Sequence, residues 1–414
     1  MENVFETLRQ RGFIQQVTGD DELERILAER KVTFYIGFDP TADSLHVGHL
    51  LPIMAMAQMQ RAGHRPIAII GGGTAMVGDP SGKTEMRRIL SREEIDANGA
   101  SILGQLQRYV DFRDGRGLFV NNADWLLSLG YIDFLRDIGR HFRVNEMIKA
   151  ESYRQRLERE EGLSFLEFNY QLLQAYDFLH LFQRHGCEVE MGGDDQWSNI
   201  LAGVDLVRRV EANPVHGMTF PLLTTARGEK MGKTAKGAVW LSATRTSPYE
   251  FYQYWINTDD RDVARFLAYF TFLPMDEVHR LGALQDAALR EAKEILACEA
   301  TKLAHGVEAA EQARLASRAA FAPSGGGESD LSGIPTSVLA LSRLEQGVPV
   351  VELFCEAGLT PSKAAARRLI EQGGAYINGE QVTAVDTVVD KNQIEADSLL
   401  LRYGKKRYHR VLVQ

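Results

Sequence analysis

Two histidines stand where a short helix is expected to begin, in the run His46-Val47-Gly48-His49. A helix N-terminus offers unpaired backbone N–H groups and the positive end of the helix dipole, and both attract phosphate. Gly48 has no side chain, so a nucleotide can approach the backbone there. The two imidazoles can donate hydrogen bonds to phosphate oxygens. Taken alone, however, the motif fits two surface histidines at a helix start better than a binding site.

A second run with possible chemistry is Lys230-Met231-Gly232-Lys233-Thr234, in a basic, glycine-bearing stretch. Its lysines can neutralise charge that develops on a pentacovalent phosphate and on a departing pyrophosphate. By itself, a solvated lysine-rich loop explains the run better.

Two further clusters of polar residues sit among apolar neighbours. Tyr170, Gln174 and Asp177 are spaced so that one face of a helix carries all three. This stripe suits a specific polar ligand about as well as a half-exposed surface. The other cluster, Gly192-Gly193-Asp194-Asp195-Gln196, can hold ribose hydroxyls or an amino acid, or can be a strand-to-helix turn with an aspartate N-cap.

The elements that must position these residues alternate between strand and helix. Residues 32–38 and 66–71 are predicted strands, 118–121 and 188–191 are weaker strand candidates, and a helix is expected from about Gly48 to Arg61. Strand, helix and strand at this spacing predict right-handed βαβ units and a doubly wound parallel sheet. Ligands bind beyond the carboxyl ends of the strands in such sheets, which is where the clusters lie.

The histidine and lysine runs together, in this order and about 180 residues apart, resemble the paired His-Ile-Gly-His and Lys-Met-Ser-Lys-Ser motifs of class I aminoacyl-tRNA synthetases. The chain has Val47 in place of isoleucine, and Gly232 and Thr234 in the second motif. The resemblance implies that His46, His49, Lys230, Lys233 and Thr234 act on the phosphates of ATP.

Within that class, the sequence most specifically resembles the bacterial-type tyrosyl-tRNA synthetases. This resemblance extends over nearly the whole chain. It rests on Tyr35 in Tyr-Ile-Gly-Phe-Asp-Pro-Thr, on the Gly-Asp-Pro-Ser-Gly run with Asp79, on the helical stripe and on Gly-Gly-Asp-Asp-Gln. The resemblance implies that Tyr35 and Asp177 contact the tyrosine phenol. It also implies that the ammonium is held by Asp79, Tyr170 and Gln174, and that Gln196 lies near the carboxyl group. ATP and adenylate contacts are expected from Gly37, Asp39, Thr41, His46, Gly48, His49, Gly193, Asp195, Met231 and Lys233.

The C-terminal part of the chain is expected to be a separate module. The run 322–330 is rich in Gly, Ser and Pro and reads as a flexible linker. After it, a basic helix ends near Gly373 and is followed by an Asn378-Gly379 hairpin turn. The module resembles an S4-like RNA-binding domain, with tRNA contacts from Lys363, Arg367, Arg368 and Arg407, although a small α/β cap with a solvated basic helix fits the same pattern.

The expected organisation has four parts. They are a Rossmann-like α/β domain at 1–220, an α-helical domain at 221–321 with the lysine motif, the linker at 322–335, and a small α+β S4-like domain at 336–414. Ten Lys or Arg residues face nine Asp or Glu residues after position 335, whereas the net charge of the whole chain is −9. The last 13 residues hold five Lys or Arg and no Asp or Glu. The acidic body and this basic tip exclude a wholly basic nucleic-acid coat and allow local RNA binding, although a solvated tail fits the charge equally well.

The composition of the chain limits where in the cell we expect the protein to be. Three widely spaced cysteines exclude a disulfide framework. We expect no membrane span and no secretory signal, and therefore a cytoplasmic location.

The sequence therefore predicts an enzyme that activates tyrosine with ATP and transfers it to tRNA, as a homodimer by family resemblance. Mg²⁺ should accompany ATP as substrate, without a metal site built from protein ligands. Three alternatives are a tryptophan-specific relative, an RNA-binding regulator without catalysis, and a nucleotidyltransferase for a small metabolite.

Overall fold

The computed structural model describes residues 3–79, 90–158, 162–229, 231–234, 237–321, 334–395, 397–404 and 407–414. The chain forms two compact units. Unit 1 comprises Met1–Ser242 and Asp259–Ala292, and unit 2 comprises Ala243–Thr258 and Lys293–Gln414. The sequence-based domain boundaries stay predictions, and most of the expected linker lies outside the described residues.

A six-stranded sheet in the order β1-β6-β5-β2-β3-β4 organises unit 1. All neighbours are parallel except β1 and β6. This result confirms the predicted doubly wound architecture. The strands are β1 (Gln16–Val17), β2 (Thr33–Phe38), β3 (Arg65–Ile70), β4 (Leu118–Asn121), β5 (Cys187–Gly193) and β6 (His216–Phe220).

The chain reverses its direction of winding between β2 and β5. The strands β3 and β4 follow β2 on one side, whereas β5 and β6 lie on its other side. Such a switch point leaves a crevice outside the strand ends, because the connections leave toward opposite sides of the sheet. The fold therefore places its main ligand crevice between the ends of β2 and β5.

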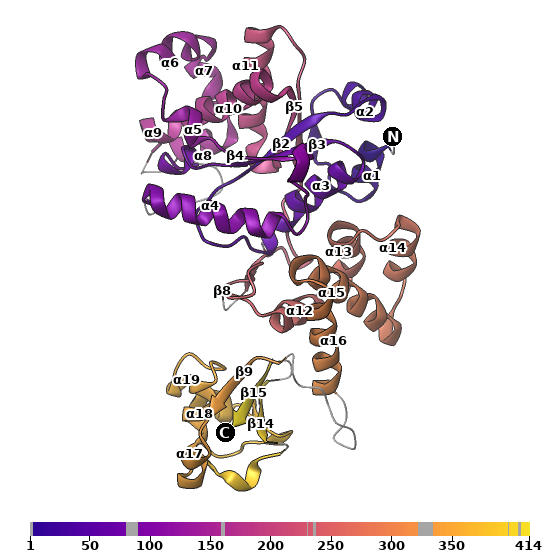
Figure 1. Ribbon diagram of the computed structural model, residues 1–414, viewed down its shortest axis with the longest axis vertical. Helices are drawn as coiled ribbons and strands as arrows, with labels where there is room; N and C mark the ends of the chain where they lie inside the picture. Colours follow the sequence, from indigo (N-terminus) through magenta and orange to yellow (C-terminus); the bar gives the residue numbers. More distant parts are fainter. Residues whose placement is uncertain are drawn as a thin grey trace. The chain divides into compact units, whose positions relative to one another are not determined.

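Helices cover both faces of this sheet (Figure 1). Helices α10 (Tyr170–His185) and α11 (Trp197–Glu211) pack on one face, and α3 (Leu50–Arg61) packs on the other. Before α3, Val47–His49 form a single 3-10 turn. Residues Tyr35, Ile67 and Ile69 of the sheet share a buried core with Leu172 and Phe178 of α10.

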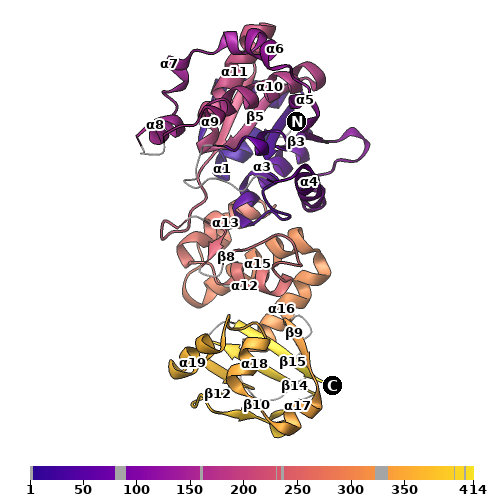
Figure 2. The same cartoon turned by 90° about the vertical axis from the view of Figure 1, so that its left-hand side faces the viewer.

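Further helices complete unit 1 (Figure 2). They are α1 (Val4–Gln10), α2 (Asp20–Glu29), α4 (Arg92–Leu106), α5 (Ala123–Leu126), α6 (Tyr131–Asp137), α7 (Val144–Met147), α8 (Glu151–Leu157), α9 (Phe165–Phe168), α13 (Val263–Phe270) and α14 (Met275–Gly282). A hairpin of β7 (Lys233–Thr234) and β8 (Gly237–Ala238) carries the second half of the lysine motif.

Unit 2 joins three helices to a small α+β module. The helices are α12 (Pro248–Ile256), α16 (Val307–Phe321) and the larger part of α15 (Leu289–His305). The module has a five-stranded sheet in the order β12-β11-β14-β15-β9, with β9 parallel to β15 and the other neighbours antiparallel.

The module's sheet packs against three helices around one core of apolar side chains. The bounds are β9 (Thr336–Leu339), α17 (Leu341–Gln346), α18 (Val350–Glu356), α19 (Lys363–Glu371), β11 (Ala375–Ile377), β12 (Glu380–Gln381), β14 (Ser398–Tyr403) and β15 (Arg407–Val413), with a short pair of β10 (Val348–Pro349) and β13 (Val388–Val389). Asn378 and Gly379 both have positive φ angles, 49° and 85°. This confirms the predicted hairpin turn, since a type I′ turn needs positive φ at both central residues.

Arg11 holds the start of the chain against the end of α13. It is 6% exposed, and its guanidinium donates to the carbonyl oxygens of Ala268, Thr271 and Leu273 at 2.8, 3.0 and 2.5 Å. These carbonyls lie at or just beyond a helix C-terminus, where a positive charge is favourable.

We therefore expect Arg11→Met to lower the free energy of unfolding by about 3 kcal/mol, because it leaves three acceptors without a charged donor. Arg9→Ala is the matched control. Arg9 sits on the same helix but is exposed and pairs with Glu6 at the surface, so its loss should cost less than about 1 kcal/mol. Equal losses in a denaturant titration would contradict the role of Arg11.

Candidate active site

One cavity of about 410 Å³ lies at the crevice between β2 and β5. Its size suits a small organic ligand. The cavity collects predicted site residues from across unit 1: Tyr35, Gly37, Asp39, Thr41, His46, Gly48, His49, Asp79, Tyr170, Gln174, Asp177, Gly193, Asp195 and Gln196.

The histidine motif occupies the turn before α3. The Nδ1 atom of His46 accepts a hydrogen bond from the backbone N–H of Gly48 at 3.0 Å. The Nδ1 atom of His49 accepts one from the backbone N–H of His46 at 3.1 Å. A neutral imidazole that accepts at Nδ1 carries its proton at Nε2. The turn therefore fixes both rings as Nε2–H donors.

The lysine motif lies directly against this turn. The backbone N–H of Val47 donates to the carbonyl of Val239, and the N–H of Leu241 donates to the carbonyl of Leu45, at 2.9 and 2.8 Å. A Cβ atom on Gly232 would lie 2.8 Å from the Gly48 nitrogen, and Gly232 has a φ of 89°. Both conditions require glycine at 232 in this arrangement.

The remaining residues of the motif are described in part. Met231 is buried, and its carbonyl oxygen lies 3.3 Å from the position that a Cβ atom on Gly48 would take. Lys233 and Thr234 form β7 through their backbones. Lys230 lies outside the described residues.

Asp177 ends the polar stripe of α10 and is 4% exposed. Its carboxylate accepts from the Trp125 indole at 2.7 Å and from the Asn122 amide at 2.9 Å. Burial raises the pKa of Asp177 to about 7, although the two donors act in the opposite direction. The cavity thus holds a desolvated acceptor in a fixed orientation.

A second buried acid lies nearby on β5. Glu190 is 2% exposed, and burial raises its pKa to about 7. It lies opposite Tyr35 in the strand register. Burial, and then the charges of Glu190 and Asp177, raise the pKa of Tyr35. The Tyr35 hydroxyl is buried, and the Glu190 carboxyl acts on it both through its charge and as a side-chain hydrogen-bond partner.

Sequence reasoning missed Asn122, Trp125 and Glu190. Asn122 directly follows β4, at the same sheet edge as the predicted residues, and that position was a usable signal. Glu190 lies in the strand candidate 188–191, where it alternates with Val189 and Met191, and the sequence does not distinguish it from the neighbouring Glu188. Trp125 belongs to the four-residue helix α5, which shows no periodic pattern.

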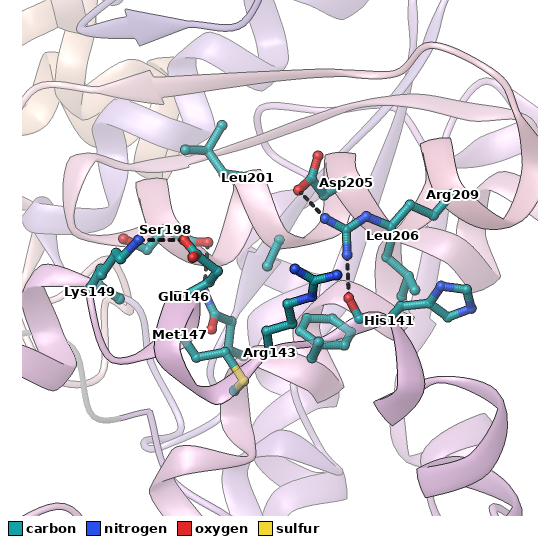
Figure 3. A pocket seen from close by; sticks show the side chains of 14 residues that line it. His141, Arg143, Glu146, Met147, Lys149, Ser198, Leu201, Asp205, Leu206 and Arg209 are labelled. Atoms are coloured by element: carbon teal, nitrogen blue, oxygen red, sulfur yellow. Dashed lines mark hydrogen bonds and ion pairs between the residues drawn. The ribbon is translucent and has the colours of Figure 1, made fainter.

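Another cavity, of about 370 Å³, lies between residues 141–150 and α11 (Figure 3). Its charged groups pair with one another: Lys149 with Glu146 at 2.8 Å, and Arg209 with Asp205 at 3.2 Å. The predicted ligand-binding residues are absent from its lining.

The predicted tRNA-contacting residues of unit 2 differ in their surroundings. Arg367 and Arg368 are exposed on α19, and Lys363 pairs with Glu352 at 2.7 Å. Arg407 is partly buried and donates to the Leu359 carbonyl at 3.0 Å.

The described residues lack both a metal-binding cluster and a membrane-spanning helix. They contain no cluster of three His, Cys, Asp or Glu side chains that could hold a metal ion. None of their helices is long and apolar enough to cross a membrane.

Comparison with known proteins agrees with the fold. Residues 27–322 match the family of class I tRNA synthetases (W and Y), so the chain is a class I aminoacyl-tRNA synthetase. Residues 328–411 match the tyrosine–tRNA ligase SYY-like C-terminal domain. With the full-length relatives below, this shows that the chain belongs to the tyrosine–tRNA ligase family.

Two such relatives are the tyrosine–tRNA ligases of Caldanaerobacter subterraneus subsp. tengcongensis and Desulfatibacillum aliphaticivorans. Each is 55% identical, over 100% and 99% of both chains respectively. A solved structure of a C-terminally truncated mitochondrial tyrosyl-tRNA synthetase from Aspergillus nidulans has 34% identity and a TM-score of 0.70, and the match covers 78% of this chain and 95% of that one.

The histidine geometry predicts the ring tautomers. In selectively ¹⁵N-labelled protein, we expect His46 and His49 to show protonated Nε2 and unprotonated, hydrogen-bonded Nδ1. The single variants His46→Gln and His49→Gln assign the signals. An Nδ1–H tautomer in either ring would contradict the capping geometry.

Proposed function

We propose that this protein joins tyrosine to ATP, forming tyrosyl-adenylate and pyrophosphate, and then transfers the tyrosyl group to the 3′ end of tRNA(Tyr). Its family supplies the reaction class. The observation that carries the proposal is the shared cavity, because the polar stripe of α10 and the phosphate-binding turn before α3 open into the same space.

Tyrosine occupies the part of the cavity beside α10. Its phenol O–H donates to Asp177 and meets the Tyr35 hydroxyl, while its ammonium lies among Asp79, Tyr170 and Gln174. Gln196 lies near the carboxyl group. Phenylalanine would leave the buried Asp177 acceptor without the phenol as a partner. Because an unpaired buried acceptor is costly, the pocket discriminates strongly against the side chain that lacks the hydroxyl.

ATP lies along the strand ends and the turn before α3. The nucleotide is surrounded by Gly37, Thr41, Gly48, Gly193 and Met231. Asp39 and Asp195 bind the nucleoside, and Asp195 contacts the ribose. The backbone amides that begin the helix face the phosphates.

Activation is an in-line displacement. A carboxylate oxygen of tyrosine forms a bond to the α-phosphorus while the bond from that phosphorus to the bridging oxygen breaks, and pyrophosphate leaves. The Nε2–H groups of His46 and His49, with Lys230, Lys233 and Thr234, stabilise the developing negative charge. Positioning and charge stabilisation are enough, so no protein nucleophile is required.

Mg²⁺ enters with ATP as part of the substrate and is held mainly by phosphate oxygens and water. In the second step, a ribose hydroxyl of the terminal tRNA adenosine attacks the tyrosyl carbonyl, and AMP leaves.

The basic C-terminal module, S4-like and beginning near residue 336, binds tRNA(Tyr) through phosphate contacts from Lys363, Arg367, Arg368 and Arg407. The proposed domains are those expected from the sequence, at 1–220, 221–321 and 336–414, with a linker at 322–335. We also propose a cytoplasmic location, because the full-length relatives are bacterial tyrosine–tRNA ligases.

We also infer that the protein is a homodimer. Apolar side chains on α5–α9 and in the segments between them are exposed, including Ile132 at 70% and Phe165 at 69%. Figure 1 shows these helices at one end of unit 1. Monomers seldom leave such a set uncovered. The others are Leu127, Tyr131, Leu135, Val144, Ile148, Leu157 and Leu166.

The deciding experiment is ATP–pyrophosphate exchange measured with each of the twenty amino acids. We expect exchange with tyrosine, and Lys233→Ala should lower its rate by about 10²-fold or more with little change in tyrosine affinity. Exchange driven by tryptophan would indicate the related specificity. No exchange, with retained RNA binding, would indicate a non-catalytic regulator.

Tyrosine affinity should depend on pH. Because burial raises the pKa of Asp177 to about 7, lowering the pH from 8 to 6 protonates the acceptor of the phenol and should raise the Kd for tyrosine about tenfold. Glu190 protonates over the same range. Equilibrium dialysis gives the Kd, with phenylalanine as the ligand that lacks the hydroxyl. A tyrosine Kd that does not change with pH would argue against Asp177 as the acceptor.

A fragment of residues 1–325 separates the two steps. It retains all the residues assigned to tyrosine and ATP but lacks the basic module, and a C-terminally truncated relative has been crystallised. We expect the fragment to remain dimeric and to form tyrosyl-adenylate, while tRNA charging collapses. In the full-length protein, tRNA affinity should fall steeply with salt. Undiminished charging by the fragment would show that the module does not bind tRNA productively.

A further inference from the structure

A chain of hydrogen bonds links two carboxylates across the floor of the cavity. The Gln174 amide nitrogen donates to Glu190 Oε1 at 2.9 Å, and the Gln196 amide nitrogen donates to Asp79 Oδ2, also at 2.9 Å. Between them, the Asn199 amide nitrogen donates to the oxygens of both glutamines, at 3.1 and 3.0 Å. Three amides thus connect Glu190 to Asp79.

The chemistry of the two ends fixes the direction of every amide between them. While both acids are ionised they only accept hydrogen bonds, so each glutamine turns its nitrogen toward its acid. The glutamine oxygens then face Asn199, whose NH₂ group has one hydrogen for each. Each glutamine oxygen keeps a second lone pair.

Burial shields the Glu190 end of the chain and its central amide from water. Glu190 is 2% exposed and Asn199 is 6% exposed. The second carboxyl oxygen of Glu190 lies beside α11, in space that is open only because Gly203 has no side chain, since a Cβ atom there would be 3.0 Å away. The hydrogen bond from Gln174 to Glu190 is therefore largely protected from exchange with water, and it orients the Gln174 amide.

We propose that Glu190 and Asn199 are positioning residues that hold the Gln174 oxygen as an acceptor, so that the cavity selects ligands with a free α-ammonium group. This inference rests on the proposed function, and specifically on the contact between Gln174 and the ammonium. Reversal of the Gln174 amide would present two N–H donors to a cation, which is a repulsive arrangement.

The test compares three ligands that differ in their charged groups. Tyrosine has both the ammonium and the carboxylate, tyramine has only the ammonium, and 3-(4-hydroxyphenyl)propionate has only the carboxylate. Their dissociation constants are measured by calorimetry or by competition, using the full-length wild-type protein and the variants Glu190→Leu, Glu190→Gln and Asn199→Asp.

Glu190→Leu removes the acceptor of the Gln174 amide nitrogen. The Kd values of tyrosine and tyramine should therefore rise about tenfold or more, while the Kd of the propionate changes less than twofold. Glu190→Gln keeps an oxygen that can accept a hydrogen bond from Gln174. Its Kd values for all three ligands should therefore stay within about threefold of the wild-type values. Asn199→Asp has the same size as asparagine but no donor. It should weaken tyramine binding as Glu190→Leu does, because tyramine lacks the carboxylate that Gln196 meets, and it carries the test if the leucine variant does not fold.

A double-mutant cycle separates positioning from general damage. In a Gln174→Ala background, Glu190→Leu should have no further effect on tyrosine binding. Equal weakening of all three ligands, or full additivity with Gln174→Ala, would overturn the inference while leaving the proposed function intact. If the wild-type protein does not bind tyrosine, the proposed function itself fails.

Discussion

The need to satisfy buried carboxylates governs the arrangement of the cavity. Asp177 and Glu190 lie below a tenth of full exposure, and an acid so removed from water must receive hydrogen bonds from the protein or its ligand. Asn122 and Trp125 meet this requirement for Asp177, and Gln174 meets it for one oxygen of Glu190, whose other oxygen is buried beside α11. These donors come from the end of β4, from α5 and from α10, so the arrangement of the crevice depends on several elements that converge on it.

The phosphate side of the cavity depends on a different constraint, the close approach of two backbones. Gly48 and Gly232 come from segments about 180 residues apart in sequence, yet neither position has room for a Cβ atom in this arrangement. Backbone hydrogen bonds on both sides of the contact join the histidine turn to the segment after the lysine motif. The two motifs therefore form one structural element, in which movement of one segment must disturb the other.

Much of this architecture could be predicted from sequence because its signals are local. The strands at 33–38 and 65–70 begin and end within one residue of the prediction. By contrast, the fully buried strand β6 escaped notice. Its residues His216, Gly217 and Thr219 lack an apolar pattern. Thr18 accepts hydrogen bonds from the first two, and Asp194 accepts one from Thr219.

The predicted site residues that lie just after strand ends reach one cavity, since parallel topology determines where those ends meet. Glu190 and Asn199 could not be predicted in this way. Neither lies in a recognisable polar motif, and their contacts with Gln174 join residues 16 and 25 positions apart in the sequence.

The direction of the amide chain also constrains how this pocket can change in evolution. When the amide nitrogen and oxygen of a glutamine both have hydrogen-bond partners, the amide group cannot turn over unless the neighbouring amides turn over too. Substitutions at Glu190, Gln174, Asn199 and Gln196 are therefore expected to be interdependent, with many single changes passing through a mismatched intermediate. Such epistasis would make the ammonium side of the pocket slow to diverge, while the solvent-facing helices around it remain free to vary.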